Sequence, residues 1–207
     1  MKISVYTFNL SVLFVTLLSC SNNNNNQLPY IGNHDIIDGD TLYHKIPPFQ
    51  FISHDSVTVD NGYLADHIYV SDFFFISCPA ICPKVKKQML RIYEEFEEEE
   101  LLKLVSHTLD TKRDSIPELK NYATNLGVEH DRWMFLTGDR DEVWQMSSEY
   151  FIATAENDEA ARGIDHSGRI VLVDKKGHVR SFAEGTDPEH VSRLIDDIYL
   201  LIGQYKR

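Results

Sequence analysis

The chain has 207 residues, of which 43% are hydrophobic and 25% are charged. That length and composition predict one globular domain with a full hydrophobic core and a short additional segment. The formal net charge of −12 argues against a nucleic-acid-binding protein, because an acidic surface repels phosphates.

The first residues have the pattern of a secretory signal. Lys2 is followed by the apolar run ISVYTFNLSVLFVTLL, which is shorter than the roughly 20 apolar residues that span a bilayer. A signal at residues 1–19 is therefore favoured over an uncleaved membrane anchor, which stays the alternative. LLSC resembles the bacterial lipobox, and it predicts lipidation of Cys20 as the first mature residue. We expect a lipid-anchored protein of the bacterial cell envelope that faces the periplasm.

The asparagine-rich tract that follows predicts a flexible tether at residues 20–45, without regular structure. The folded domain is expected at 46–207. It begins with FQFIS and SVTVD, which predict a β-hairpin at 49–59. The nearly continuous apolar run at 67–77 predicts a strand that is buried on both faces. Further strands are predicted at 101–109 and 132–137, and a second hairpin is predicted at 169–182.

Four helices are predicted after strands, from apolar residues at steps of three and four. Ser115 and Glu118 have the spacing of a capping box, and Gly127 is placed to end that helix. Residues 153–165 show no period and are predicted to form a long loop. The predicted helix starts lie at Pro83, Ser115, Asp139 and Asp187.

This order of elements predicts an α/β domain with a central, mostly parallel sheet flanked by helices on both faces. A βαβ half followed by a ββα half is the thioredoxin-like arrangement. In that arrangement the chemistry lies where the first core strand turns into its helix, at the carboxyl end of the strand. Cys78 and Cys82 occupy this turn, in the sequence CPAICP.

The four-residue spacing of Cys78 and Cys82 bears on their chemistry. On a regular helix the two Cβ atoms are about 5–6 Å apart, whereas a disulfide prefers roughly 3.5–4.5 Å. The spacing favours a metal ion between the sulfurs, and a disulfide requires a distorted turn. A helix N-terminus favours thiolates, and Lys84, Lys86 and Lys87 add positive charge nearby.

His166 is the candidate third ligand. It lies in IDHSGRIVLV, immediately before a strand whose end faces the cysteine turn in a thioredoxin-like sheet. Two thiolates and one imidazole suit copper, especially Cu(I), while zinc usually takes a fourth ligand. Asp165 is a candidate to restrain His166 or to place negative charge beside it. The other histidines considered look structural: His107, His130, His178 and His190.

The motifs together resemble the Sco/SenC family of thioredoxin-like copper proteins that serve cytochrome oxidase assembly. The likeness covers about residues 49–202. Phe75-Ile76 and Thr111 depart from the family pattern, and neither is expected to touch a ligand. The resemblance implies that Cys78, Cys82 and His166 bind Cu(I) and Cu(II). It also implies copper delivery to, or thiol reduction of, the copper site of a respiratory oxidase subunit. The segments that carry it are CPAICP, LDTKRDSIPELKNYA, WMFLTG, IDHSGRIVLVDKKG and EGTDPEHVSRLIDDI.

Two alternatives stay open from the sequence. The chain could be an extracytoplasmic thiol–disulfide oxidoreductase, in which Cys78 attacks a partner's cysteine, Cys82 resolves and His166 matters little. It could also be an envelope binding module with a structural disulfide, although a bridge that closes so small a loop constrains little chain entropy.

Overall fold

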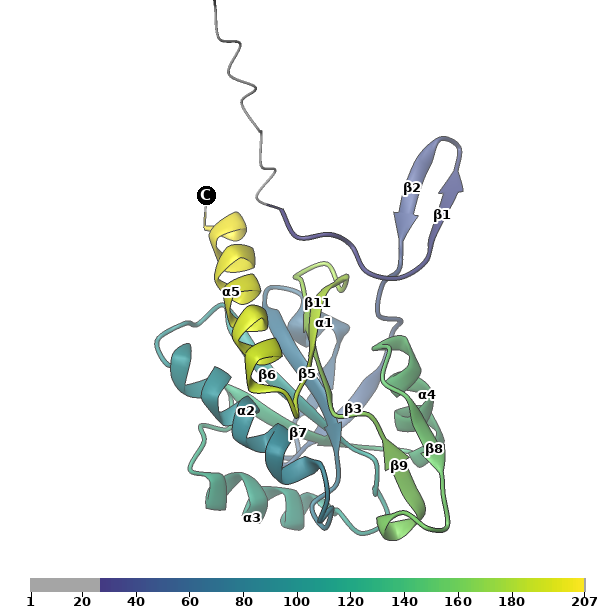
Figure 1. Cartoon of the computed structure of the whole chain (residues 1–207), viewed down its shortest axis with the longest axis vertical. Coiled ribbons are helices and arrows are strands. Elements are labelled where there is room, and N and C mark those ends of the chain that lie inside the picture. Colours follow the sequence, from purple (N-terminus) through teal and green to yellow (C-terminus); the bar gives the residue numbers. More distant parts are fainter. Residues whose placement is uncertain (1–26, 207) are drawn as a thin grey trace, which may run out of the picture.

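The computed structural model describes residues 27–206 (Figure 1). The predicted signal at 1–19 and the predicted lipidation site Cys20 lie outside the described residues. Within residues 27–206, no helix combines the length and the apolarity needed to cross a membrane.

A seven-stranded sheet forms the centre of the domain, in the order β11-β10-β5-β6-β7-β3-β4. Strands β5, β6 and β7 pair in parallel at its middle, and antiparallel strands extend the sheet on both sides. Every residue of β5 is buried, as its continuous apolarity predicts. The bounds are β3 Gln50–Ser53, β4 Thr58–Asp60, β5 Ile68–Phe74, β6 Leu102–Thr108, β7 Trp133–Thr137, β10 Arg169–Val173 and β11 Val179–Glu184.

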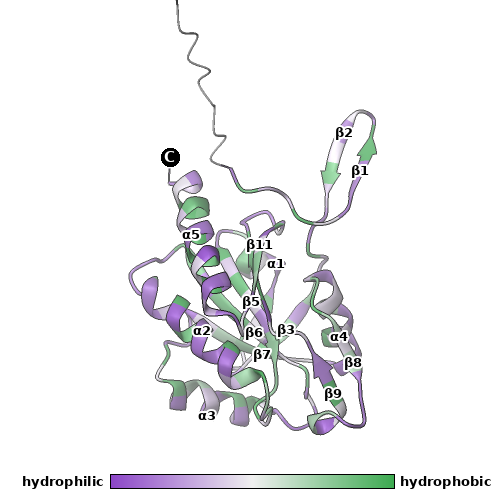
Figure 2. Cartoon of the chain, in the orientation of Figure 1, coloured by the Kyte–Doolittle hydropathy of each residue, from purple (hydrophilic) through white to green (hydrophobic). Residues whose placement is uncertain are grey.

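Helices cover both faces of this sheet, which confirms the predicted α/β architecture (Figure 1). Helices α2, α3 and α5 lie on one side, and α4 lies on the other. Along α2 and α5, hydrophobic and hydrophilic residues alternate, as expected of helices with one buried face (Figure 2). The bounds are α1 Asn61–Leu64, α2 Cys82–Glu95, α3 Ile116–Leu126, α4 Arg140–Glu149 and α5 Pro188–Tyr205.

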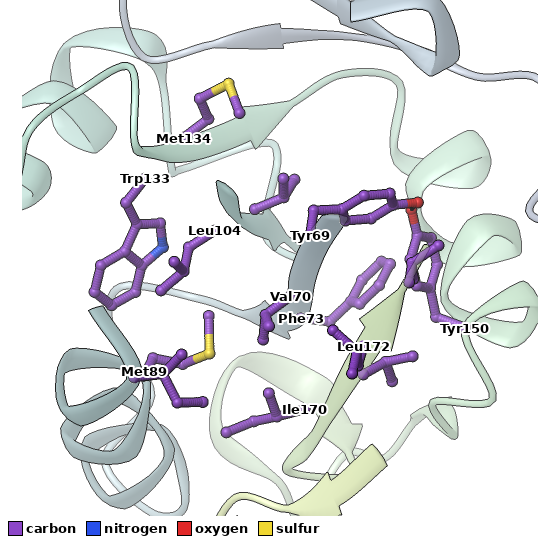
Figure 3. Close-up of a cluster of buried hydrophobic side chains, with 14 of the residues drawn as sticks. Tyr69, Val70, Phe73, Met89, Leu104, Trp133, Met134, Tyr150, Ile170 and Leu172 are labelled. Atoms are coloured by element: carbon purple, nitrogen blue, oxygen red, sulfur yellow. Dashed lines mark hydrogen bonds between the residues drawn. The ribbon is translucent and has the colours of Figure 1, made fainter. Parts of the chain in front are cut away.

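The core lies on the two faces of the sheet, because successive strand residues point to opposite sides. On one side the hydroxyl groups of Tyr69 and Tyr150 are 2.9 Å apart and buried (Figure 3). On the other side Met89 of α2 lies beside Val70 and Ile170, and none of its surface is exposed (Figure 3). Met89 is therefore a packing residue, as its place on the apolar stripe of α2 predicts.

The helices begin and end where the sequence predicts, but the predicted capping bond of Ser115 is absent. The carboxylates of Asp139 and Asp187 accept hydrogen bonds from backbone N–H groups in the first turns of α4 and α5. Gly127 ends α3 in the left-handed region, with a φ of 71°. The Ser115 side chain makes no capping hydrogen bond. Pro117 stands at the second helical position and has no N–H, so one of the two usual partners of the cap is missing.

The prediction of an irregular segment up to Lys45 is wrong for residues 34–43. Strands β1 (His34–Ile37) and β2 (Asp40–Tyr43) form an antiparallel hairpin, which stands apart from the central sheet (Figure 1). Asp38 and Gly39 turn it with φ angles of 54° and 90°. An Asp-Gly pair is a strong hairpin signal, and it marked this turn in the sequence.

The long loop predicted at 153–165 is also partly wrong. Strands β8 (Thr154–Glu156) and β9 (Ile164–His166) pair with each other, and one 3-10 turn, η1 (Ala161–Gly163), joins their ends. Strands of three residues are too short to show a period in the sequence. This small hairpin carries His166 at the end of β9.

Candidate metal centre

The cysteine turn joins the buried strand β5 to α2. Cys78 lies in the turn, where its N–H donates to the carbonyl oxygen of Phe75 at 3.2 Å. Cys82 is the first residue of α2. The Asp114 carboxylate fixes the start of the turn by accepting the N–H of Ile76 at 3.0 Å. Both cysteines are free, and only 8% of Cys78 and 5% of Cys82 is exposed.

The structure brings His166 to the two cysteines, as predicted. The Sγ atom of Cys82 and Nε2 of His166 are 3.5 Å apart in a buried contact. The sulfurs of Cys78 and Cys82 and one ring nitrogen of His166 all lie within 4.8 Å of one another. The ring of Phe75 packs edge-on against the His166 ring, at 5.8 Å between centroids, so the expectation that Phe75 does not touch a ligand is wrong. Two soft sulfurs and one nitrogen therefore converge at one buried point.

The hydrogen bond of the His166 ring to the backbone leaves the lone pair of Nε2 available to a metal ion. Its Nδ1 lies 3.1 Å from the carbonyl oxygen of Ser167. A carbonyl oxygen only accepts, so Nδ1 carries the hydrogen and the lone pair of Nε2 faces Cys82. Burial lowers the pKa of His166, and the Ser167 carbonyl and the charges of Asp72 and Asp165 oppose this shift. Asp165 itself is exposed and acts on the ring through its charge.

The protonation state of Cys82 differs from the one that its place in the sequence predicts, which is a thiolate. Burial raises its pKa well above the ordinary value, and its hydrogen bond with Cys78 raises it further. The backbone at Phe75 lowers the pKa, but desolvation is the larger effect. Cys82 is therefore a neutral thiol in the metal-free protein, and a metal ion must displace its proton to bind.

A buried lysine lies behind the cysteine turn. The Nζ atom of Lys86 is 3.5 Å from the Asp72 carboxylate and 3.3 Å from Oγ of Ser106, and only 5% of the residue is exposed. Lys84 and Lys87, whose charges looked equally relevant from the sequence, are exposed. Lys86 follows Cys82 by four positions, and this places it on the buried stripe of α2.

Aromatic rings complete the surroundings of this ammonium group. Lys86 Nζ lies 4.5 to 5.9 Å from the centroids of four rings, which is within the range of cation–π attraction. Ser106 donates its hydroxyl hydrogen to Asp72 and accepts the indole N–H of Trp133 at 2.9 Å. A fixed ion pair is thus buried one helical turn from Cys82. The rings belong to Phe74, Tyr122, Trp133 and Phe135.

A second group of potential ligands, His54, Asp55 and His130, also lies within 4.8 Å. Its hydrogen bonds do not suit a metal ion. Nδ1 of His54 accepts the N–H of Phe135 at 3.1 Å, so Nε2 carries the hydrogen and has no free lone pair. The Asp55 carboxylate is already paired with Lys120 at 3.0 Å and with His130 at 2.9 Å. We interpret this group as an ion-pair cluster.

Comparison with known proteins identifies the family of the chain. The family model SCO1/SenC matches residues 38–200. The chain belongs to the SCO1/SenC family. Among curated proteins, the SCO1 protein homolog of Bacillus subtilis is 26% identical over 161 residues, which cover 77% of this chain and 83% of that protein.

Solved structures of Sco proteins share the thioredoxin-like fold, so the predicted fold class is confirmed. A SCO1/SenC family lipoprotein of Bacillus anthracis has a TM-score of 0.69 at 22% identity, covering 76% of this chain and 95% of that one. BsSco, a member of the Sco family of cytochrome c oxidase assembly proteins with a disulfide switch, has a TM-score of 0.66 at 25% identity, covering 76% and 93%. Copper-bound ScoI of Arabidopsis thaliana has a TM-score of 0.64 at 22% identity, covering 77% and 98%.

Proposed function

We propose that this chain is a copper-binding assembly factor for a respiratory cytochrome oxidase and that Cys78, Cys82 and His166 hold the copper. The convergence of the three ligand atoms within 4.8 Å carries this proposal. Thiolates and imidazole are the donors that Cu(I) prefers. The copper-bound Sco structure and the oxidase-assembly role of BsSco support the same conclusion.

The surroundings of the three proposed ligands suit a bound copper ion. Bound copper is a soft cation that accepts lone pairs from two thiolates and one imidazole. Ser167 holds the His166 ring in the tautomer that presents Nε2. Burial of most of Cys78 and Cys82 limits contact between the sulfurs and water, which slows exchange of a thiolate–copper centre with solvent. Release then requires a partner that reaches the sulfurs.

The second candidate function is thiol–disulfide exchange with a cysteine pair of the partner. The two sulfurs lie close enough for a modest movement of the turn to join them, and BsSco contains a disulfide switch. In this role Cys78 attacks and Cys82 resolves, and His166 contributes little. The two roles are compatible, because a partner's cysteines must be reduced before they can take copper.

The location is part of the proposal. We infer that residues 1–19 are removed, that Cys20 receives the lipid and that residues 20–45 link the anchor to a domain at 46–207 in the periplasm. The lipoprotein of Bacillus anthracis in the same family supports the lipid anchor. Mass spectrometry of the membrane-bound protein checks it, since Cys20→Ser should abolish the lipid mass. The partner in this account is a copper-bearing subunit of a respiratory oxidase.

Titration of the reduced protein with Cu(I) against a chromophoric competitor tests the function. We expect one copper per chain and an affinity loss of at least about tenfold in His166→Ala. Loss of a residue that only supports a metal ligand commonly costs that much in metal affinity, and His166 is proposed as a ligand itself. His190→Ala changes an imidazole outside the three ligands and is the matched control. Stoichiometry well below one, or unchanged affinity in His166→Ala, contradicts the site. Oxidase activity in cells that carry only the Cys78→Ser variant tests the assembly role.

A further inference from the structure

The two cysteines line a groove on the side of α2 that faces α3. Its cavity volume is about 360 Å³. Cys78 and Cys82 contribute to its floor, Leu90 of α2 forms one wall, and Tyr122 and Leu126 of α3 form the other. The ligand set therefore has an approach from solvent that is bordered by apolar side chains.

This approach lies apart from the one that His166 occupies. His166 comes from β9 and is absent from the residues that line the groove. The edge contact of its ring is with Phe75, and its Nε2 faces Cys82 from that direction. A partner can therefore reach the sulfurs through the groove without first displacing the histidine.

The groove has an exposed positive charge at its rim although the protein is strongly acidic. Its only charged lining residues, among those that the structure describes, are Lys86 and Lys87. The whole chain carries a net charge of −12. Lys86 is held by Asp72 from behind, while Lys87 is exposed at the rim and free to meet a ligand. A negative group is the complement of this rim.

We propose that the groove binds a partner segment that carries a cysteine beside apolar residues and an acidic residue positioned for Lys87. The inference rests on the proposed function and names the surface through which it works. Copper transfer and thiol exchange both require a partner sulfur to meet Cys78 or Cys82, and the groove is where these sulfurs border a cavity. Its apolar walls provide the contact area, and the rim charge selects the segment.

Peptides activated as disulfides of 2-thiopyridine test the groove. A thiolate of the reduced protein attacks the peptide cysteine, the S–S bond breaks, and pyridine-2-thione leaves with the electron pair and is measured by absorbance. The second protein thiolate then attacks the mixed disulfide and releases the reduced peptide. The protein dithiol is oxidised and the activated peptide is reduced, so the electrons balance.

The comparison uses two peptides with the same apolar residues around cysteine, one with glutamates and one with lysines at the flanks. Rates are divided by the rate with neutral dipyridyl disulfide, which corrects for intrinsic thiol reactivity. We expect the acidic peptide to react about fivefold faster than the basic one, as one exposed charge contact can provide. Lys87→Glu should bring this ratio to one or below. Lys84→Glu makes the same charge change on an exposed residue of α2 outside the groove and should preserve it.

Equal rates for the two peptides with the wild-type protein would overturn the inference. An equal effect of Lys84→Glu and Lys87→Glu would also overturn it, because the preference would then come from overall charge. Leu126→Asn should slow both peptides relative to the neutral probe, and unchanged rates contradict an apolar wall at this residue. The Cu(I) titration separates the two proposals. If the protein binds copper normally but does not distinguish the two peptides, only the proposal of a partner groove is contradicted. If it distinguishes the peptides but does not bind copper, only the proposal of a copper-binding function is contradicted.

Discussion

The Sγ atom of Cys82 lies 3.5 Å from Nε2 of His166, although 84 positions separate the two residues. Two contacts hold the segment around His166 against the cysteine turn and α2. Arg162 of η1 donates from Nε to Oγ of Ser77 in the cysteine turn at 3.1 Å. Gly168 packs so closely on α2 that a Cβ there would lie 2.9 Å from a methyl group of Val85. The ligand set therefore depends on how the chain after β9 rests on α2.

Gly185→Ala should disturb this arrangement. The N–H of Gly185 donates to the carbonyl oxygen of Gly168 at 2.8 Å, and a Cβ on Gly185 would lie 2.7 Å from the same oxygen. The backbone at Gly168, two residues after His166, must move to relieve the overlap. We expect a loss of about 1–3 kcal/mol in the free energy of unfolding and a weaker affinity for Cu(I).

Gly203→Ala is the matched control for this change. It lies within α5, and a Cβ there meets nothing within 4 Å. Alanine is the better helix former, so this variant should gain about 0.5–1 kcal/mol and bind copper normally. Chemical denaturation and copper titration measure both effects. Wild-type copper affinity in a folded Gly185→Ala protein would show that the position of Gly168 does not matter to the site.

Lys86→Met should destabilise the protein strongly. It leaves the Asp72 carboxylate buried without its cation, and breaking a buried pair in this way typically costs about 3–5 kcal/mol. Burial lowers the pKa of Lys86, while the charge of Asp72 and its hydrogen bond raise it, so the ammonium form depends on this carboxylate. Thermal or denaturant unfolding at neutral pH measures the loss.

The double variant Asp72→Asn/Lys86→Met separates charge from packing. It removes both charges and leaves an apolar chain among the aromatic rings, so most of the lost stability should return. If the double variant is as unstable as Lys86→Met alone, the aromatic cage around the ammonium, and not the ion pair, is the main source of stability.

His107 should make the protein sensitive to acid. No surface of the residue is exposed, both ring nitrogens lack a hydrogen-bond partner among the described residues, and its ring stacks on Phe73 at 4.6 Å. Burial lowers the pKa of His107 to about 3. The unfolded chain therefore binds one more proton than the folded chain between about pH 6.5 and pH 3. Stability from this residue is complete above that window and falls by about 1.4 kcal/mol per pH unit as the pH drops through it.

His107→Phe should remove this part of the pH dependence. The free energy of unfolding, measured from neutral pH to about pH 4, should decline less steeply with falling pH than in the wild type. The difference in slope tests the claim even if the larger ring changes the absolute stability. His34→Asn, on the exposed strand β1, is the control and should keep the wild-type slope. Parallel curves for His107→Phe and the wild type would contradict a neutral buried imidazole.

Copper affinity should rise with pH. Burial raises the pKa of Cys82, so its thiol gives up a proton only when the metal binds. Mass action then makes the apparent affinity for Cu(I) increase about tenfold per pH unit for each proton released. Competition titrations at several pH values between about 6 and 8 measure the slope. A flat profile would mean that the thiolates are already formed in the metal-free protein.

Much of this site could be predicted because its signals are local. Cys78 and Cys82 mark the end of a strongly apolar strand, and His166 precedes the next clear strand, so an α/β chain order brings them to one edge. The same logic found the central strands and the long helices, whose periods extend over many residues. The Asp-Gly turn at 38–39 was an equally local signal, but the surrounding exposed strands have no apolar period to support it.

Other features depend on contacts between distant segments. The thiol of Cys82 looked acidic from its place at a helix start, whereas its burial between elements decides its protonation. Lys86 belongs to a row of three lysines in the sequence, and only the packing of α2 against Asp72 and the aromatic rings distinguishes it. The partner of His166 Nδ1 is a backbone carbonyl, which no side-chain pattern reveals.

X-ray absorption spectroscopy at the copper edge of the Cu(I)-loaded protein tests the central claim most directly. Two sulfur neighbours and one nitrogen neighbour are predicted for the wild type, with loss of the nitrogen in His166→Ala and of one sulfur in Cys82→Ser. A wild-type spectrum with sulfur neighbours alone, or one that His166→Ala leaves unchanged, would contradict the proposed copper centre.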